Sequence, residues 1–375
     1  MISQNAPALA HAFILAHQAY RRKSEQLAGH DSNIEAVTDA GASPYEEVRD
    51  HFHFVDNYVH QLDVNAEALA TALFLSGSDR RSALIHYLSD HFGVEVDFAG
   101  SANDPVRAYD RKTSRLIPNR LAPRPTQVFQ LAYQISQLQG GKEIEELVTE
   151  AGFKTEEAKD ICRIGLHNYF AGALIMPYMD FLGAARSLRH DIELLAEQFE
   201  ASVEQVCHRL STLQRPGSKG VPIFFARIDR AGNITKRHSA TRLQFARYGA
   251  ACPLWNAHRA FDVADGIIRQ LPETPDGVQF LCLATRTHKG MGGFAARRTA
   301  YVLAFGCEIS YAEHFVYADD LRIGDRSVFE PIGISCRLCE RSNCASRAMP
   351  PIRGRIEVDQ DKRDAIPYRL ISQIR

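Results

Sequence analysis

The sequence predicts an α+β protein with a helical N-terminal half and a mixed C-terminal half. Apolar residues recur at helical spacing through most of residues 5–92 and again up to about residue 213. After the Pro- and Gly-containing segment 214–220, alternating apolar runs typical of strands take over. Three of the eight cysteines fall within Cys336–Cys344, so the C-terminal half carries the most concentrated chemistry.

The helical half contains one predicted interruption and one clear helix start. Alternating apolar residues within 93–118 predict a small β-meander. Helical spacing returns over Gln127–Leu138, and the apolar set of Asn168–Leu182 predicts one further helix. Ser202 and Gln205 match a capping box, which predicts that a helix begins there.

The C-terminal half is separated by the linker Gln214–Gly220, which Pro, Gly and Ser punctuate. Strands are predicted over Val221–Asp229, Gln279–Thr287 and Thr299–Ile309. These boundaries divide the chain into a helical segment 1–42, a helical domain 43–213 with the β-meander, and an α+β domain 221–375.

Composition excludes several classes of protein. The formal net charge of the 375 residues is −1, so no global basic field favours nucleic-acid binding. No apolar stretch approaches the roughly 20 residues that span a bilayer, so no membrane partner is expected. A convincing signal peptide is also missing, and a cytoplasmic location is the default expectation. In that reducing setting clustered cysteines favour metal ligation over disulfides.

The segments 107–118 and 125–137 resemble the ImmA/IrrE metallopeptidase-like domain. That family places an H-E-x-x-H motif on a helix after a β-hairpin, where two histidines hold zinc and the glutamate acts as general base. Tyr133, Gln134 and Gln137 stand at the matching positions. We therefore expect a degenerate peptidase scaffold that has lost zinc and hydrolysis.

A second resemblance covers nearly the whole chain. Its motifs are Val206–Arg215, Gly232–Ser239, Ala251–Trp255, Phe305–Cys307 and Cys336–Cys344. Together they resemble the short-chain fatty acyl-CoA-responsive transcriptional regulators, which include regulators of the methylcitrate (propionate) cycle and of acetate metabolism. The resemblance implies a sensor that binds an acyl-CoA and carries an iron–sulfur cluster in a C-terminal domain, which we expect to be GAF-like.

Members of that family begin with a helix-turn-helix domain, the usual module for reading the major groove. Met1–Gln18 show no such module. The chain is either a ligand-binding fragment of a longer regulator or a natural variant without DNA binding. DNA is therefore expected as a partner only through a module that this chain lacks, and a homo-oligomer is expected.

The loop with Cys336, Cys339 and Cys344 has the spacing C-x2-C-x4-C, which suits zinc or an iron–sulfur cluster. A zinc ribbon usually pairs two C-x2-C knuckles, and no second pair is present. Three close cysteines and one distant one fit a 4Fe–4S cluster better, with zinc and free thiols as alternatives. As the fourth ligand we favour Cys307 over Cys252, because the glycine before Cys307 would let a cluster approach the backbone.

Coenzyme A carries phosphates that need Arg or Lys, and its acyl group needs an apolar slot. Basic candidates for these contacts are Arg80, Arg81, Lys289, Arg297 and Arg298. Tyr169 and Tyr178 belong to an apolar set that suits the slot. The plain alternatives are solvated surface charge for the basic residues and ordinary core for the tyrosines.

No G-x-S-x-G, H-E-x-x-H or P-loop motif is present, so no catalytic residue is predicted and the chain is not expected to be an enzyme. His208, His238 and His258 each read as structural. Two alternatives stay open: a residual metallopeptidase with an unrecognised metal site, and a zinc-stabilised interaction protein.

Overall fold

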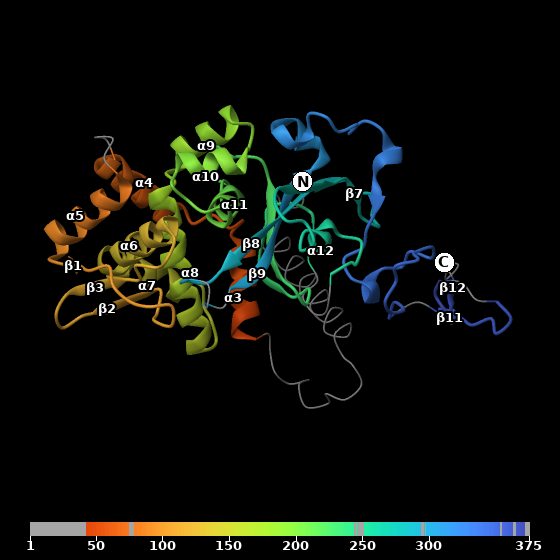
Figure 1. The fold of residues 1–375 in the computed structure, drawn as a ribbon, viewed down its shortest axis with the longest axis horizontal. Helices are drawn as coiled ribbons and strands as arrows, with labels where there is room; N and C mark the ends of the chain where they lie inside the picture. The colour runs from red at the N-terminus through yellow and green to blue at the C-terminus, as the bar shows by residue number, and fades with distance from the viewer. Residues whose placement is uncertain are drawn as a thin grey trace, which may run out of the picture.

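The computed structural model describes residues 43–74, 79–243, 245, 251–293, 296, 298–352, 355–362 and 365–371. The predicted segment 1–42 lies outside these residues. Helices fill the first half and a five-stranded sheet forms the centre of the second, which confirms the α+β class (Figure 1). None of the described helices is long and apolar enough to cross a bilayer.

The helical half contains a short three-stranded sheet in the order β1-β3-β2. The strands of this sheet are β1 (Glu95–Val96), β2 (Arg107–Asp110) and β3 (Arg115–Pro118). The helices are α3 (Pro44–Phe54), α4 (His60–Phe74), α5 (Arg80–Phe92), α6 (Arg124–Gln139), α7 (Gly141–Glu150), α8 (Glu156–Ile175), α9 (Tyr178–Ser187), α10 (Ile192–Gln198) and α11 (Val203–Ser211).

Local sequence explains where two of these helices begin and end. The predicted capping box is confirmed, because Gln205 N donates to Ser202 Oγ at 3.3 Å and Ser202 N donates to Gln205 Oε1 at 2.6 Å. The single helix predicted over Asn168–Leu182 is wrong. Pro177 disfavours helical geometry at Met176, whose φ is −130°, so α8 ends at Ile175 and α9 follows.

The C-terminal half is built on one antiparallel sheet with the order β5-β4-β9-β8-β6. Its strands are β4 (Ile223–Asp229), β5 (Ile234–Ser239), β6 (Ile267–Gln270), β8 (Phe280–Lys289) and β9 (Thr299–Glu308). The remaining elements are α12 (Asn256–Arg259), β7 (Pro272–Glu273), β10 (Glu330–Pro331), β11 (Arg355–Glu357), β12 (Arg369–Ile371) and the 3-10 turns η2 (Ile309–His314), η3 (Val316–Ala318), η4 (Arg326–Val328) and η5 (Cys336–Leu338). The GAF-like description stays a prediction.

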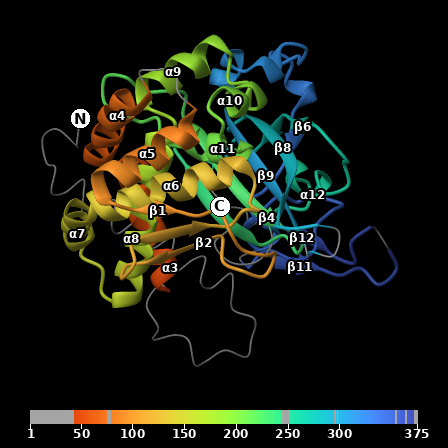
Figure 2. The same ribbon diagram turned by 60° about the vertical axis from the view of Figure 1, so that its left-hand side comes forward.

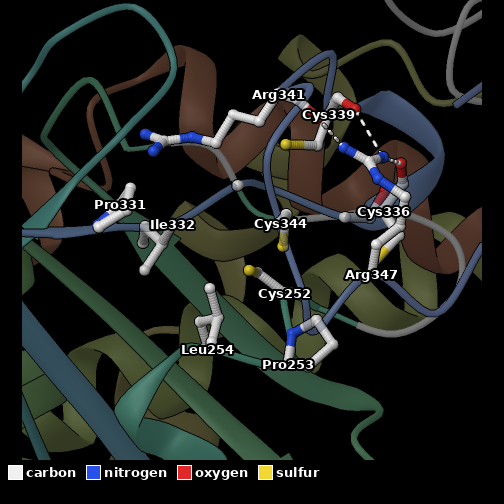
Figure 3. Close-up of a pocket in the computed structure, with 12 residues that line it drawn as sticks. Cys252, Pro253, Leu254, Pro331, Ile332, Cys336, Cys339, Arg341, Cys344 and Arg347 are labelled. Atoms are coloured by element: carbon white, nitrogen blue, oxygen red, sulfur yellow. Dashed lines mark hydrogen bonds between the residues drawn. The ribbon is translucent and has the colours of Figure 1, made fainter. Parts of the chain in front are cut away.

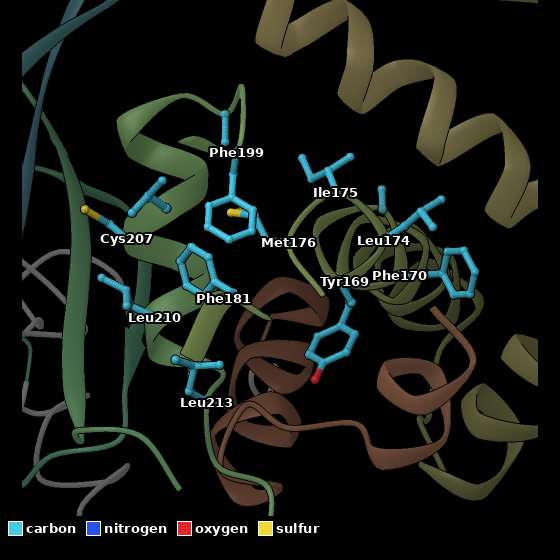
Figure 4. Close-up of a cluster of buried hydrophobic side chains, with 14 of the residues drawn as sticks. Tyr169, Phe170, Leu174, Ile175, Met176, Phe181, Phe199, Cys207, Leu210 and Leu213 are labelled. Carbon is cyan, nitrogen blue, oxygen red and sulfur yellow. The ribbon is translucent and has the colours of Figure 1, made fainter. Parts of the chain in front are cut away.

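The sheet buries both faces. Phe225 pairs with Phe305 on the face that joins the core of the helical half. Phe224 points to the opposite face, where it packs with Trp255 and Phe280 next to α12. The helices α8, α9 and α11 meet in the large core shown in Figure 4. One hydrophobic core therefore runs from the helices onto the near face of the sheet, and a second core covers the far face.

A buried ion pair ties the helices to the linker. The carboxylate of Asp63 is fully buried on α4 and accepts hydrogen bonds from Arg209 on α11 at 2.8 and 3.0 Å. Tyr169 of α8 donates to the same carboxylate at 2.6 Å, and Arg215 of the linker lies 3.3 Å away. Burial alone raises the pKa of Asp63, but Arg209, Tyr169 and Arg215 outweigh burial and hold it below its usual value.

We expect Asp63→Ala to lower the free energy of unfolding by about 3–5 kcal/mol, because it leaves buried Arg209 without its counter-charge. Chemical denaturation measures the loss. Asp97→Ala, which removes an exposed partner of Arg115, is the control and should cost under about 1 kcal/mol. Since the pKa of Asp63 is lowered in the folded protein, the wild type should lose this stability as the pH falls below the pKa of an ordinary aspartate and toward the lowered pKa of Asp63. Equal losses in the two variants would contradict this role.

Candidate functional site

Four cysteines line one small cavity in the C-terminal half. Three come from the predicted loop, and the fourth is Cys252, which precedes α12 (Figure 3). Cys252 N donates to Ile334 O at 3.1 Å, so the two segments lie side by side. The cavity is lined by Cys252, Pro253, Leu254, Pro331, Ile332, Gly333, Ser335, Cys336, Cys339, Arg341, Cys344 and Arg347.

Cys307 lies elsewhere. It is fully buried in β9, opposite Leu281 of β8, and belongs to the core on the helical face of the sheet. Glycine is required at position 306 by the close approach of β8, because a Cβ there would lie 1.9 Å from the carbonyl oxygen of Leu281. The structure thus brings Cys252, and not Cys307, to the loop. This corrects the choice that we made from the glycine, while metal ligation itself stays a prediction.

Arg347 and Gly333 shape the loop. Arg347 is 6 % exposed, and its guanidinium donates to the carbonyl oxygens of Cys339 at 2.9 Å, of Cys336 at 3.4 Å and of Arg341. Gly333 leaves room for the Cys339 thiol, since a Cβ on Gly333 would lie 2.9 Å from Cys339 Sγ.

None of the eight cysteines, all of which lie among the described residues, forms a disulfide. No three His, Cys, Asp or Glu side chains in the described part of the chain are arranged to hold a metal ion. Cysteine thiolates are the ligands of a 4Fe–4S cluster, and the four thiols around this cavity match the number of ligands that such a cluster takes. Arg341 and Arg347 line the same cavity and would offset the charge of a thiolate-bound centre. The type and number of these donors, though not their present spacing, therefore fit an iron–sulfur cluster.

A second cavity, of about 230 Å³, lies between the helices and the sheet, and we call it the interdomain cavity. Phe129, Gly172 and Met176 give it an apolar wall, while Lys236 and Lys289 from the sheet give it a cationic side. Its remaining lining residues are Thr126, Gln130, Asn168, Tyr169, Ser202, Glu204, Gln205, His208, Arg209 and Thr212.

The cationic side of this cavity converges on Glu204 at the start of α11. Lys289 Nζ lies 2.7 Å from Glu204 Oε2, Arg227 donates to Oε1 at 3.0 Å, and Lys236 Nζ is 3.9 Å away. Three cations face one carboxylate, so the group carries excess positive charge. Burial opposes ionisation of Glu204, but these cations outweigh it and lower its pKa.

The predicted acyl-CoA residues are not gathered in one place. Tyr169 and Lys289 line the interdomain cavity. Tyr178 lies in the adjacent core, where Arg215 stacks on its ring at 4.0 Å and its hydroxyl donates to Ser218 O. Arg298 is exposed, and Arg297 lies outside the described residues.

Arg80 and Arg81 have structural contacts within the helical half. Arg80 donates to Ile175 O, and its guanidinium lies 5.2 Å from the ring of Phe199. Arg81 donates to Gln127 Oε1 at 3.1 Å and stacks on Phe98. Neither residue lines the interdomain cavity.

The sequence did not indicate a histidine pair at the boundary between the helices and the sheet, which we call the seam. His208 Nε2 of α11 lies 3.1 Å from His238 Nε2 of β5, and His238 Nδ1 lies 3.0 Å from Asn57 Oδ1. Burial and the nearby Lys236 lower the pKa of His238 to about 3, so the pair is neutral. The two histidines are 30 positions apart and carry no shared motif, so only the fold brings them together.

The segment that resembles the peptidase motif lies on α6. Tyr133, Gln134 and Gln137 stand where zinc ligands and the base would be, and Arg107 of β2 reaches across to both glutamines. One imidazole, that of His167, lies near Tyr133, but its Nδ1 is 2.8 Å from Ser136 Oγ.

Comparison with known proteins supports both resemblances. Residues 212–368 match the family described as short-chain fatty acyl coenzyme A regulator, C-terminal, and residues 89–211 match the IrrE N-terminal-like domain. A propionyl-CoA carboxylase regulator of Cereibacter sphaeroides is 47% identical over 99% of this chain and 79% of its own length. The HTH-type transcriptional regulator PrpR of Mycobacterium tuberculosis is 37% identical over 98% of this chain and 76% of its own length.

The fold also has a solved counterpart. A Mycobacterium tuberculosis transcriptional regulator superposes with a TM-score of 0.82 at 37% identity, covering 87% of this chain and 99% of the other. The HTH-type transcriptional regulator RamB of the same organism is 36% identical over 98% of this chain and 79% of its own length. The chain therefore belongs to the family of short-chain fatty acyl-coenzyme A regulators.

Proposed function

We propose that the chain is the ligand-sensing part of a transcriptional regulator, that it binds a short-chain acyl-CoA in the interdomain cavity, and that it holds a 4Fe–4S cluster on Cys252, Cys336, Cys339 and Cys344. The observation that carries the acyl-CoA part is the composition of the cavity wall. An apolar side suits a short acyl group, and a cationic side suits phosphate.

The position of the cavity supports sensing. Its walls come from α6, α8 and α11 on one side and from β5 and β8 on the other. A ligand that contacts both sides stabilises one arrangement of the helices and the sheet, which is the differential affinity that a sensor requires. A DNA-binding module, fused or associated, would read that arrangement. We propose no hydrolytic role, because α6 offers glutamine and tyrosine in place of zinc ligands.

For the cluster, the supporting observation is that four free thiols from two segments line one cavity with two arginines. When bound, an iron–sulfur group supplies a redox-active or structural centre. Arg347 holds the loop in place, and Gly333 leaves room for the thiol of Cys339.

We expect Cys252→Ala to abolish stoichiometric iron and sulfide in anaerobically purified protein and to remove its brown colour, because it removes one of the four thiols. Cys307→Ala is the matched control and should keep the colour, since that thiol lies in the sheet core. Iron and sulfide analysis with absorption spectra measures both. Loss in Cys307→Ala with retention in Cys252→Ala would overturn the assignment, and a colourless protein with one bound zinc would support the zinc-stabilised alternative.

We expect acetyl- or propionyl-CoA to bind more tightly than free coenzyme A in isothermal titration, because the acyl group gains the apolar wall. Lys289→Gln should weaken acyl-CoA binding about tenfold through loss of a charged contact. Lys112→Gln, an exposed lysine on the β2–β3 hairpin, is the control and should leave binding unchanged. Equal affinities for free and acylated coenzyme A, or an unaffected Lys289→Gln variant, would contradict this site.

A further inference from the structure

A third cavity, of about 470 Å³, is lined by Gln134 and Gln137, two of the three residues that match the peptidase motif, and we call it the α6 groove. Its lining residues come from the β2–β3 hairpin and from α6, both of which Figure 2 shows in the helical half. Its lining residues are Arg107, Tyr109, Arg111, Gln134, Gln137 and Leu138. None of its lining residues lines the cysteine cavity or the interdomain cavity.

Arg107 brings an unbalanced positive charge into the groove. Its Nη1 donates to the side-chain oxygens of Gln134 and Gln137, and its guanidinium lies 4.5 Å from the centre of the Tyr133 ring. All of these partners are neutral, and no carboxylate in the described part of the chain pairs with Arg107. Burial lowers the pKa of Arg107. A desolvated guanidinium is costly unless an anion accompanies it, so the groove lacks a counter-charge.

Gln134 adds an unused hydrogen-bond donor. Its side chain is 1 % exposed, its oxygen accepts from Arg107, and its Nε2 has no hydrogen-bond partner. A buried amide left unpaired costs about 1–3 kcal/mol, so such a group calls for a missing acceptor. The rim of the groove adds a second guanidinium, that of exposed Arg111, and the phenol of Tyr109.

His167 does not supply the missing acceptor or a second charge. Burial and the cations Arg107 and Arg163 lower its pKa to about 4, so the imidazole is neutral at physiological pH. Its Nδ1 is already engaged with Ser136 Oγ. Every unmet group in the groove is therefore a donor, and two of the groups are cationic.

We propose that the α6 groove is an anion-binding site that takes a carboxylate or phosphate group between Arg107, Gln134 and Arg111. The Arg107 guanidinium lies beside the residues that match the peptidase motif as a permanent cation, so it attracts anions there. The anionic group has two sources, a free small anion or the phosphate end of the acyl-CoA. The second source rests on the proposed function, and it is within reach because Gln130 of the interdomain cavity and Gln134 are one turn apart on α6.

Thermal unfolding and titration of the anaerobically purified chain test the proposal. Inorganic phosphate and succinate are the free anions, and coenzyme A and pantetheine are the second set of ligands. If the source is a free anion, phosphate or succinate raises the Tm of the wild type, and Arg107→Met weakens this binding at least about tenfold. If the source is the acyl-CoA, Arg107→Met weakens binding of coenzyme A but not of phosphate-free pantetheine.

Arg115→Met is the matched control, because Arg115 lies on the same hairpin but pairs with Asp97 outside the groove. Arg115→Met should leave binding of the free anions and binding of coenzyme A unchanged. Arg107→Met removes a half-buried cation but also its hydrogen bonds to Gln134 and Gln137, so circular dichroism verifies that each variant is folded before the titrations. Gln134→Leu is the second variant and should weaken binding of the same ligands as Arg107→Met.

The proposal is overturned if binding of neither set of ligands depends on Arg107, or if Arg115→Met changes binding as much as Arg107→Met does. If the wild type does not bind acyl-CoA, the proposed function is wrong. The measurements with phosphate and succinate then test the groove by themselves.

Discussion

The buried carboxylate of Asp63 is the constraint on which the rest of the helical half depends. It accepts hydrogen bonds from α8, α11 and the linker, so three segments that are distant in sequence must meet at the two oxygens of this carboxylate. A charge buried this deeply is tolerated only when its partners are placed accurately. The position of α11, which carries Glu204 and His208 to the sheet, follows from this requirement.

The seam between helices and sheet is polar for much of its length, in contrast to the continuous core beneath it. Arg237 of β5 binds Glu46 of α3 at 2.8 Å, Arg227 binds Glu204, and His238 contacts Asn57. Hydrogen-bonded ion pairs fix the relative orientation of two elements more strongly than apolar contacts do. A charged ligand can take the place of one partner in such a pair. A charged ligand in a cavity at this boundary would therefore compete with the ion pairs that join the two halves.

Local features of this chain could be predicted from sequence, and long-range ones could not. The capping box at Ser202 depends on four consecutive residues, so it was read correctly. The helix across Pro177 was misread because its apolar periodicity continues on both sides of the break. The structure brings Cys252, and not Cys307, to the loop: the glycine beside Cys307 is required by a close strand contact, and sequence does not distinguish that need from space for a cluster.

The cysteine cavity and the interdomain cavity contact opposite faces of the same sheet. Cys252 and Ile332 pack in the core of the far face, next to Phe224 of β4. Phe225, the next residue, faces the core that includes α11. A group bound by the four thiols would fix the C-terminal segment against the far face, while a ligand in the interdomain cavity would fix the helices against the near face. Because adjacent residues of one strand serve the two faces, loss of order on one side removes packing support from the other.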